Sequence, residues 1–368
     1  MTRTATAAVL RAHGNAPALE TVTIPDLRPD EVLVCIAGVG ICHTDLTAAD
    51  GGVPLPLPAV LGHEGAGIVA EIGSEVTELA VGDAVVLGFD SCRTCRNCRR
   101  GRPAYCTRFA PLNYGGRRPD GSTTLHDAAG EPVHGNWFGQ SSFSSLAVAT
   151  ARNAVRLPDD VPVALAGPLG CGLQTGAGTV LNTLRPEPGS SIAVFGLGAV
   201  GMAAIAAARI AGCTTIVGVD PNPRRHDLAG QLGATAVLSP DEKTARQIRE
   251  LTGGGADFAV ESVGSEAVIR QALSSLASPG TCATLGLRAG RNPITVDQTH
   301  LLSGRTLTGV IEGDSDPHVF LPQLARWWRE GRFPVDALVR TFPFEKFGDA
   351  LAAVEAGEVV KAVLTFEE

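Results

Sequence analysis

Four cysteines in one short stretch form the most regular pattern of potential metal ligands in the chain. They are Cys92, Cys95, Cys98 and Cys106, spaced C-x2-C-x2-C-x7-C. Four thiolates in one loop can complete a tetrahedral shell around a zinc ion, and a shell of four protein ligands leaves no position for a substrate. The spacing therefore predicts a structural zinc site, with an iron–sulfur centre as the alternative.

Three further residues of ligand type, Cys42, His63 and Cys171, lie far apart in the sequence. Each alone says little, because a single cysteine is usually a small buried hydrophobe and a single histidine usually a hydrogen-bonded core residue. Their local segments are Gly40-Ile-Cys-His-Thr-Asp, Gly62-His-Glu-Gly-Ala-Gly and Pro168-Leu-Gly-Cys-Gly-Leu-Gln-Thr. Two thiolates and one imidazole leave a fourth zinc position open for water or substrate, as a catalytic zinc requires.

A glycine-rich segment, Gly196-Leu-Gly-Ala-Val-Gly201, follows a short apolar run and opens an alanine-rich one. This is the dinucleotide-binding pattern, in which glycines let the backbone approach a pyrophosphate at a helix N-terminus. Asp220 follows Gly201 by nineteen residues, where a carboxylate binds ribose hydroxyls and repels a 2′-phosphate. The pattern therefore favours NAD over NADP, although Arg224 and Arg225 would suit NADP unless they are only a solvated helix start.

The elements that position these residues belong to two kinds of sequence. Up to Cys171, short β-rich runs alternate with Gly and Pro, which indicates an irregular β domain. From Ser191 the pattern is strand (191–195), helix (199–210) and strand (215–219), with further strands at 258–261 and 282–285. Strands that alternate with helices imply a parallel, doubly wound sheet, so the fold class is α/β. A helix at 347–356 and a strand at 361–366 end the chain.

Composition excludes several classes of protein. The 368 residues suffice for two domains, and 44% hydrophobic with 18% charged residues rules out a disordered chain. The net charge of −8 argues against nucleic acid as a partner. No apolar run reaches membrane-spanning length and no signal peptide is evident, so we expect a cytoplasmic protein. One basic cluster, which we interpret as a solvated surface, contains Arg93, Arg96, Arg99, Arg100, Arg102 and Arg108.

Together these motifs resemble the zinc-containing medium-chain alcohol dehydrogenases, from Val32 to Phe366. Segments 301–306 and 363–366 also look like that family, and segments 168–182, 136–143 and 311–315 look like its aryl-alcohol (benzyl alcohol) branch. The resemblance implies a GroES-like catalytic domain at 1–171, to which 312–368 returns, and a Rossmann NAD-binding domain at 172–311. It also implies hydride transfer from a small alcohol to NAD, giving the aldehyde or ketone, and the reverse reaction.

The resemblance assigns a role to each matching residue. Cys42, His63 and Cys171 match the catalytic zinc ligands, and Glu64 matches a carboxylate that can approach that zinc. Asp45 matches the acceptor that orients the ligand histidine, and Thr44 the hydroxyl that bonds the substrate oxygen. Matches to cofactor contacts are His43, Thr175, Gly196, Gly198, Val200, Gly201, Asp220, Arg225 and Lys361. Many relatives end a proton relay with a histidine where this chain has Thr47, which cannot act as a base.

For the substrate we expect a primary alcohol with an aromatic or allylic group. Residues at or near the family's substrate channel are Val53, Phe89, Trp137, Phe138, Leu285 and Leu287. Trp137 and Phe138 could instead pack the domain core, and Glu312 could recognise a polar substrate tail or lie at a subunit contact. Terpenoid alcohols such as geraniol are the nearest alternative substrates, polyols a more distant one, and a non-catalytic binding protein the rival function. We expect a homodimer, with a homotetramer as the alternative.

Overall fold

The computed structural model describes residues 3–366, which divide into two compact units. The first unit takes the chain up to Cys171, together with Asp316–Glu330 and everything from Val339 onward. The second takes Gly172–Ser315 and Gly331–Leu338. Residues 312–315 and 331–338 therefore pack with the second unit, whereas the sequence predicted that 312–368 return to the first. Within residues 3–366 no helix combines the length and the apolar character needed to cross a membrane.

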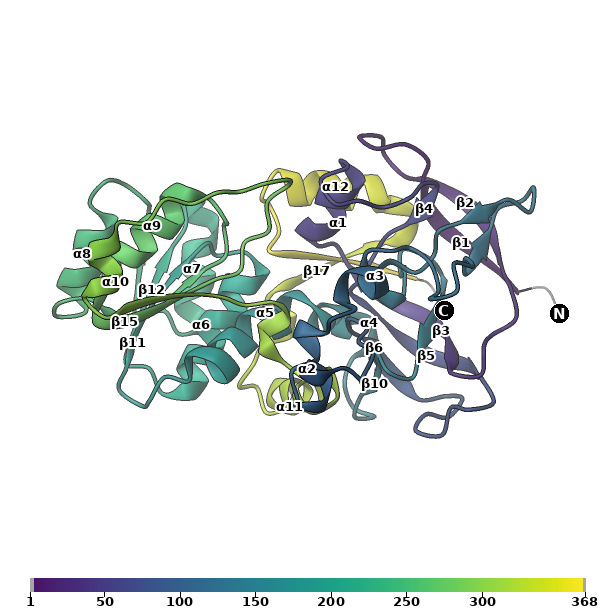
Figure 1. Ribbon diagram of the computed structural model, residues 1–368, viewed down its shortest axis with the longest axis horizontal. Helices are drawn as coiled ribbons and strands as arrows, with labels where there is room; N and C mark the ends of the chain where they lie inside the picture. The colour runs from purple at the N-terminus through teal and green to yellow at the C-terminus, as the bar shows by residue number, and fades with distance from the viewer. Residues whose placement is uncertain (1–2, 367–368) are drawn as a thin grey trace. The chain divides into compact units, whose positions relative to one another are not determined.

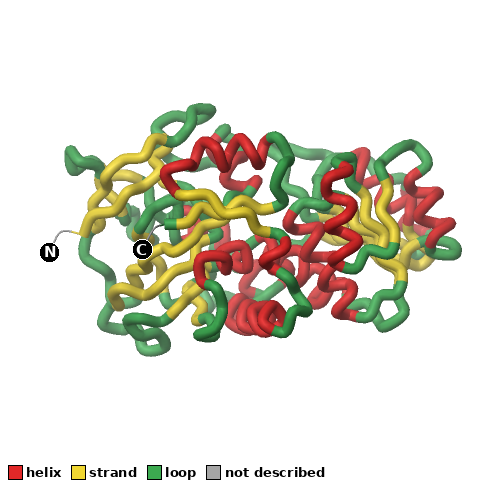
Figure 2. The backbone as a smooth tube through the Cα atoms, turned by 180° about the vertical axis from the view of Figure 1, so that it is seen from behind, coloured by secondary structure: helices red, strands yellow, loops and turns green. Residues whose placement is uncertain are grey.

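The first unit contains two mainly antiparallel sheets, seen as yellow strands in Figure 2. The smaller has the order β4-β1-β2-β7-β8, and the larger the order β10-β6-β5-β3-β18-β17, with β9 also paired to β3. The strands of the smaller sheet are β1 (Arg3–Leu10), β2 (Ala18–Ile24), β4 (Ala59–Val60), β7 (Leu125–His126) and β8 (Pro132–Val133). Those of the larger are β3 (Glu31–Gly40), β5 (Gly65–Ile72), β6 (Ala84–Leu87), β9 (Leu146–Thr150), β10 (Ala154–Arg156), β17 (Val339–Pro343) and β18 (Lys361–Thr365).

The end of β3 and the beginnings of β5 and β18 lie at the same edge of the larger sheet, which brings distant parts of the chain together. β3 pairs antiparallel with β5, with Val39 opposite Gly65, and with β18, with Gly40 opposite Val363. The end of β3 therefore lies beside the starts of β5 and β18. Residues at or just outside these ends, such as Cys42, Glu64 and Lys361, must then come close together.

Short helices cover the sheets of the first unit. They are α1 (His43–Ala49), α2 (Arg96–Arg99), α3 (Phe109–Asn113), α4 (Val163–Ala166), α11 (Pro317–Arg329) and α12 (Phe347–Glu355). After α4, the turn at 167–170 presses onto the sheet, because a Cβ at Gly167 would lie 2.0 Å from the carbonyl oxygen of Glu64. Only glycine allows this approach, and it delivers Cys171 to the same edge.

The second unit is built on a six-stranded parallel sheet with helices along both faces (Figures 1 and 2). The order is β13-β12-β11-β14-β15-β16, the order of a Rossmann fold. The strands are β11 (Ser191–Phe195), β12 (Thr215–Val219), β13 (Ala236–Leu238), β14 (Ala256–Glu261), β15 (Leu276–Thr284) and β16 (Arg305–Gly309). The helices are α5 (Gly172–Gly178), α6 (Ala199–Ala211), α7 (His226–Leu232), α8 (Thr244–Leu251), α9 (Glu266–Ser275) and α10 (Gln298–Leu302). The predicted α/β class is confirmed.

The first turn of α6 packs against the glycine-rich loop that precedes it. A Cβ at Gly201 would lie 1.8 Å from the carbonyl oxygen of Gly196, whereas nothing lies within 4 Å of a Cβ at Gly198. Gly196 itself has a φ of +89°, which a side chain rarely tolerates. Glycine is therefore needed at position 196 for its backbone conformation and at position 201 for close packing of the helix. At Gly198 the space beside the backbone is open.

We expect Gly201→Ala to lower the free energy of unfolding of the second unit by about 1–3 kcal/mol, because the methyl group must displace backbone. The matched control is Gly230→Ala in α7, where a Cβ meets nothing within 4 Å. That change should be neutral or should stabilise by up to about 1 kcal/mol, the difference in helix propensity. Urea unfolding monitored by circular dichroism measures both, and equal stability of the two variants would contradict the packing argument.

Candidate active site

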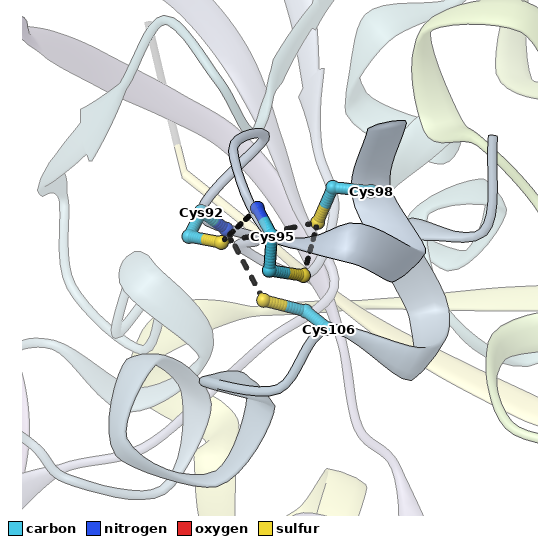
Figure 3. Close-up of side chains that lie close together, drawn as sticks. All are labelled: Cys92, Cys95, Cys98 and Cys106. Atoms are coloured by element: carbon cyan, nitrogen blue, oxygen red, sulfur yellow. Dashed lines mark hydrogen bonds between the residues drawn. The ribbon is translucent and has the colours of Figure 1, made fainter. Parts of the chain in front are cut away.

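The four cysteines of the Cys92–Cys106 loop face one another (Figure 3). Their sulfur atoms all lie within 4.8 Å of one another, with 3.5 Å between Cys95 and Cys98 and 4.0 Å between Cys92 and Cys98. Backbone N–H groups point at the sulfurs: that of Cys95 donates to Cys92 at 3.3 Å, and that of Cys92 to Cys106 at 3.3 Å. The arrangement is that of a tetrahedral thiolate shell.

The ionisation of these thiols fits a bound dication. Backbone N–H groups of Cys98 and Thr107 lower the pKa of Cys95 to about 5, because they stabilise the thiolate. Burial raises the pKa of Cys98 to about 12, so the protein alone does not hold four thiolates together. A zinc ion would supply the missing positive charge.

The second group of potential ligands, Cys42, His63, Glu64 and Cys171, also has its ligand atoms within 4.8 Å of one another. His63 and Glu64 precede β5, Cys42 follows β3 at the N-terminus of α1, and Cys171 ends the turn after α4. Cys42 and Cys171 are 129 residues apart in the sequence. The sheet edge and the glycine turn described above bring them together.

His63 is oriented by Asp45, as the resemblance implied. The imidazole is buried, and its Nδ1 lies 2.7 Å from Oδ1 of Asp45, while its Nε2 lies 3.2 Å from Sγ of Cys171. With Nδ1 held by a carboxylate, Nε2 is the ring nitrogen that faces the thiols and the one that a metal would bind. Hydrogen bonding to Cys171 holds the pKa of Cys42 well below its usual value, which favours the thiolate.

Glu64 forms a buried ion pair with Lys361. The ammonium group lies 2.9 Å from Oε1 and 2.8 Å from Oε2 of Glu64, and it also donates to the carbonyl oxygen of Ile41 at 2.9 Å. Burial raises the pKa of Glu64, and the positive charge of Lys361 opposes that rise. Sequence reasoning expected Lys361 as a cofactor phosphate contact. Here its ammonium group is bound to Glu64 and Ile41, and the phosphate contact stays a prediction.

Helix α1 carries the remaining polar residues of the site. Thr44, in its first turn, is half-buried, and His43 beside it is exposed. Thr47 is buried, and its hydroxyl donates to the carbonyl oxygen of His43 at 2.9 Å, within the helix. This hydroxyl is therefore used locally, which agrees with the expectation that Thr47 cannot replace a relay histidine.

Two of the three aromatic residues expected to line a substrate channel, Trp137 and Phe138, pack against His63. Phe138 stacks on the imidazole with 4.3 Å between ring centroids, and Trp137 meets it edge-on at 6.4 Å. The indole of Trp137 is 0% exposed and donates to Asp45 at 2.9 Å. For Trp137 this favours the alternative that it packs the core. Sequence reasoning missed the hydrogen bond, because nothing in the order of residues links Trp137 to Asp45.

The other expected channel residues differ in exposure. Phe89 and Val53 are buried in the core of the first unit. Leu285 and Leu287 belong to the second unit, where Leu287 is 41% exposed. Their role as aliphatic walls stays a prediction.

The expected cofactor residues of the second unit gather around the glycine-rich loop. Asp220, at the end of β12, is buried, and its Oδ2 accepts the backbone N–H of Leu197 at 2.7 Å. Arg225 lies 3.2 Å from the same oxygen. Val200 lies in the first turn of α6 and Thr175 on α5, both partly buried. A carboxylate beside a glycine loop with open space above Gly198 fits a dinucleotide.

Glu312 does not present a free carboxylate. It is 8% exposed, has a φ of +50°, and accepts a hydrogen bond from the side-chain amide of Gln174 at 3.1 Å. The sequence left two uses open for it, a polar substrate tail and a subunit contact. In the second unit the carboxylate is buried and bonded to Gln174, and both uses stay predictions.

Comparisons with known proteins agree with both sites. Residues 28–159 match the alcohol dehydrogenase GroES-like domain, and residues 199–327 match the zinc-binding dehydrogenase domain. The chain is 46% identical over 366 residues to geraniol dehydrogenase of Castellaniella defragrans, covering 98% of each protein.

Two solved structures are similar over almost their whole length. One is an alcohol dehydrogenase zinc-binding domain protein from Burkholderia ambifaria (48% identity, TM-score 0.98, 100% of both chains). The other is benzyl alcohol dehydrogenase from Acinetobacter calcoaceticus (40% identity, TM-score 0.95, 99% of this chain and 100% of that one). The chain belongs to the zinc-binding medium-chain alcohol dehydrogenases, enzymes that use zinc and a nicotinamide dinucleotide.

Proposed function

We propose that this alcohol dehydrogenase oxidises a primary alcohol with an aromatic or allylic apolar group to the aldehyde, with NAD as the oxidant. The observation that carries the proposal is the cluster of Cys42, His63 and Cys171, with Nε2 of His63 aimed at two thiols. We assign zinc chemistry to the first unit and NAD binding to the second. The bound zinc supplies a Lewis acid for the alcohol oxygen, and the nicotinamide supplies the hydride acceptor.

The chain's own residues prepare this chemistry. Asp45 holds His63 in the ligating tautomer. The ion pair with Lys361 offsets the charge of Glu64. We assign Cys42, His63 and Cys171 as the three zinc ligands, which leaves one position for substrate. Thr44 follows Cys42 by two residues, and we assign its hydroxyl oxygen to accept a hydrogen bond from the hydroxyl group of the alcohol.

The preference for NAD rests on Asp220. Its buried carboxylate is anchored by the N–H of Leu197 beside the glycine loop. A 2′-phosphate near that oxygen would bring two negative charges together in a poorly hydrated place, whereas ribose hydroxyls can donate to it. Arg225 lies 3.2 Å from the same carboxylate and partly offsets its negative charge.

The substrate class rests on two relatives whose names point to similar alcohols. Geraniol is allylic and benzyl alcohol is aromatic, and both place a flat apolar group next to a primary carbinol carbon. A geraniol-type substrate is therefore the second candidate, favoured by the 46% identity over nearly the whole chain.

A homodimer completes the proposal. β16 is an edge strand of the six-stranded sheet, and α10 beside it exposes Leu301 (49%) and Leu302 (75%). An unpaired edge next to exposed apolar side chains suits pairing with a second copy of the chain about a two-fold axis.

The two metal sites should be separable by mutation. Cys98→Ser should release one zinc and lower the melting temperature, because the four-Cys loop would lose its cross-link. Cys171→Ser should also release one zinc but leave a folded protein without turnover, since it removes one of the three ligands of the catalytic zinc. Elemental analysis and thermal unfolding measure both. Fully active wild-type enzyme with a single zinc per chain would contradict the assignment.

Cofactor choice should depend on Asp220. We expect kcat/KM with NAD to exceed that with NADP in the wild type, and Asp220→Gly to reduce the ratio by about tenfold or more, the size of one lost charge effect near 1.4 kcal/mol. Asp227→Gly, an acidic residue of α7 in the same unit, is the control and should leave the ratio unchanged. Equal or better use of NADP by the wild type would refute the preference.

The substrate class is tested by a panel of ethanol, hexanol, geraniol, benzyl alcohol and cyclohexanol compared by kcat/KM. Burying a ring gains about 0.8 kcal/mol per methylene equivalent, so benzyl alcohol or geraniol should exceed ethanol by at least about tenfold. If geraniol gives the highest kcat/KM, the geraniol-type substrate proposed above as the second candidate is the correct one. If ethanol or the secondary alcohol cyclohexanol leads, the proposed class is wrong.

A further inference from the structure

The hydrogen bond from Trp137 to Asp45 connects an aromatic turn to the ligand His63. Nε1 of the indole donates to Oδ1 of Asp45 at 2.9 Å, and the same oxygen accepts Nδ1–H of His63 at 2.7 Å. Trp137 is 0% and Asp45 1% exposed. A charge-assisted hydrogen bond in such dry surroundings is stronger than one at the surface. Two side-chain donors from different segments therefore share one carboxylate oxygen.

The backbone of the turn at 137–139 is built to hold the two rings in place. The N–H of Trp137 donates to the hydroxyl of Ser141 at 2.9 Å, and that hydroxyl donates to the carbonyl oxygen of Val60 at 2.6 Å. Phe138 has a φ of +51°, a left-handed conformation that costs a non-glycine residue energy. This conformation lets adjacent residues reach one imidazole: the ring of Phe138 stacks on it while the indole reaches Asp45.

The carboxylate of Asp45 needs this second donor to be fixed. Its other contacts are the backbone N–H of Gly62, at 3.1 Å from Oδ1, and that of Cys42, at 3.3 Å from Oδ2. These are longer than the two side-chain bonds. Trp137 is therefore one of four donors to this carboxylate, and at 2.9 Å it is the nearest after His63. The direction of the hydrogen bond at Nδ1 and the negative charge of its acceptor determine the orientation of the ring and the basicity of Nε2 toward a metal.

We propose that Trp137 is a positioning residue for the catalytic zinc, acting through Asp45 on His63, and not a wall of the substrate channel. The inference rests on the proposed function only in taking Cys42, His63 and Cys171 as zinc ligands. It concerns how tightly that zinc is held, so it is measurable without substrate. Loss of a direct hydrogen-bond partner of a ligand typically costs about 10- to 100-fold in metal affinity. Trp137 acts one bond further away, so about three- to tenfold is expected.

The test compares wild-type holoenzyme with Trp137→Phe, which keeps an aromatic ring and removes the donor. Dipicolinate is added and the zinc remaining per chain is followed by native mass spectrometry. We expect one zinc to leave the variant about three- to tenfold faster, while the four-Cys zinc leaves at the wild-type rate and reports an intact fold. Trp328→Phe, which alters the buried tryptophan of α11 in the same unit, is the control and should match wild type.

A double-mutant cycle separates action through Asp45 from simple packing. In an Asp45→Ala background, adding Trp137→Phe should not accelerate zinc loss further, because the acceptor that couples Trp137 to His63 is gone. Equal acceleration in both backgrounds would overturn the proposal. An unchanged rate of zinc loss in Trp137→Phe alone would also overturn it. If that variant also lost its preference for benzyl alcohol over ethanol, Trp137 would be a wall of the substrate channel. Turnover of the wild type tests the proposed function separately.

Discussion

Burial of opposite charges in a small volume is the constraint on which the catalytic centre depends. Glu64, Asp45 and two cysteines lie at one edge of a sheet, all largely removed from water. An isolated charge in such a place costs several kcal/mol or more. Lys361 compensates Glu64, and the donors around Asp45 compensate that carboxylate. The negative charge of the thiolates would be balanced by a metal cation held between them and His63.

The same constraint explains why the last strand returns to the first unit. Lys361 is the first residue of β18, which pairs with β3, and its side chain reaches the carbonyl oxygen of Ile41 and the carboxylate of Glu64. The positive charge therefore arrives from a segment almost three hundred residues further along the chain. Without that strand, Glu64 would be a buried carboxylate beside two thiols. The pairing of β18 with β3 therefore also supplies the positive charge that lies beside Glu64.

What the sequence predicted follows from how local each signal is. The spacing of Cys92 to Cys106 and the run from Gly196 to Gly201 place their chemistry within a few residues, and both segments have the predicted form. The α/β class was also readable, because strand and helix periodicity are local. Pairings such as Trp137 with Asp45, 92 residues apart, depend on how loops pack in three dimensions. No local pattern contains that information, so a residue expected in a channel proved to be buried beside a ligand.

The contrast between the two metal centres shows how one chain separates structure from catalysis. In the Cys92–Cys106 loop, backbone N–H groups donate directly to the sulfurs, so a four-thiolate shell can be held by a short stretch of chain. In the second centre the potential ligands come from three segments; Asp45 is hydrogen-bonded to the one imidazole, Phe138 stacks on it, and Trp137 donates to Asp45. A shell with an open position lacks the rigidity that a fourth ligand would give. Its geometry must therefore come from the surrounding protein, and the aromatic turn and the buried ion pair are the parts of that surrounding nearest to the ligands.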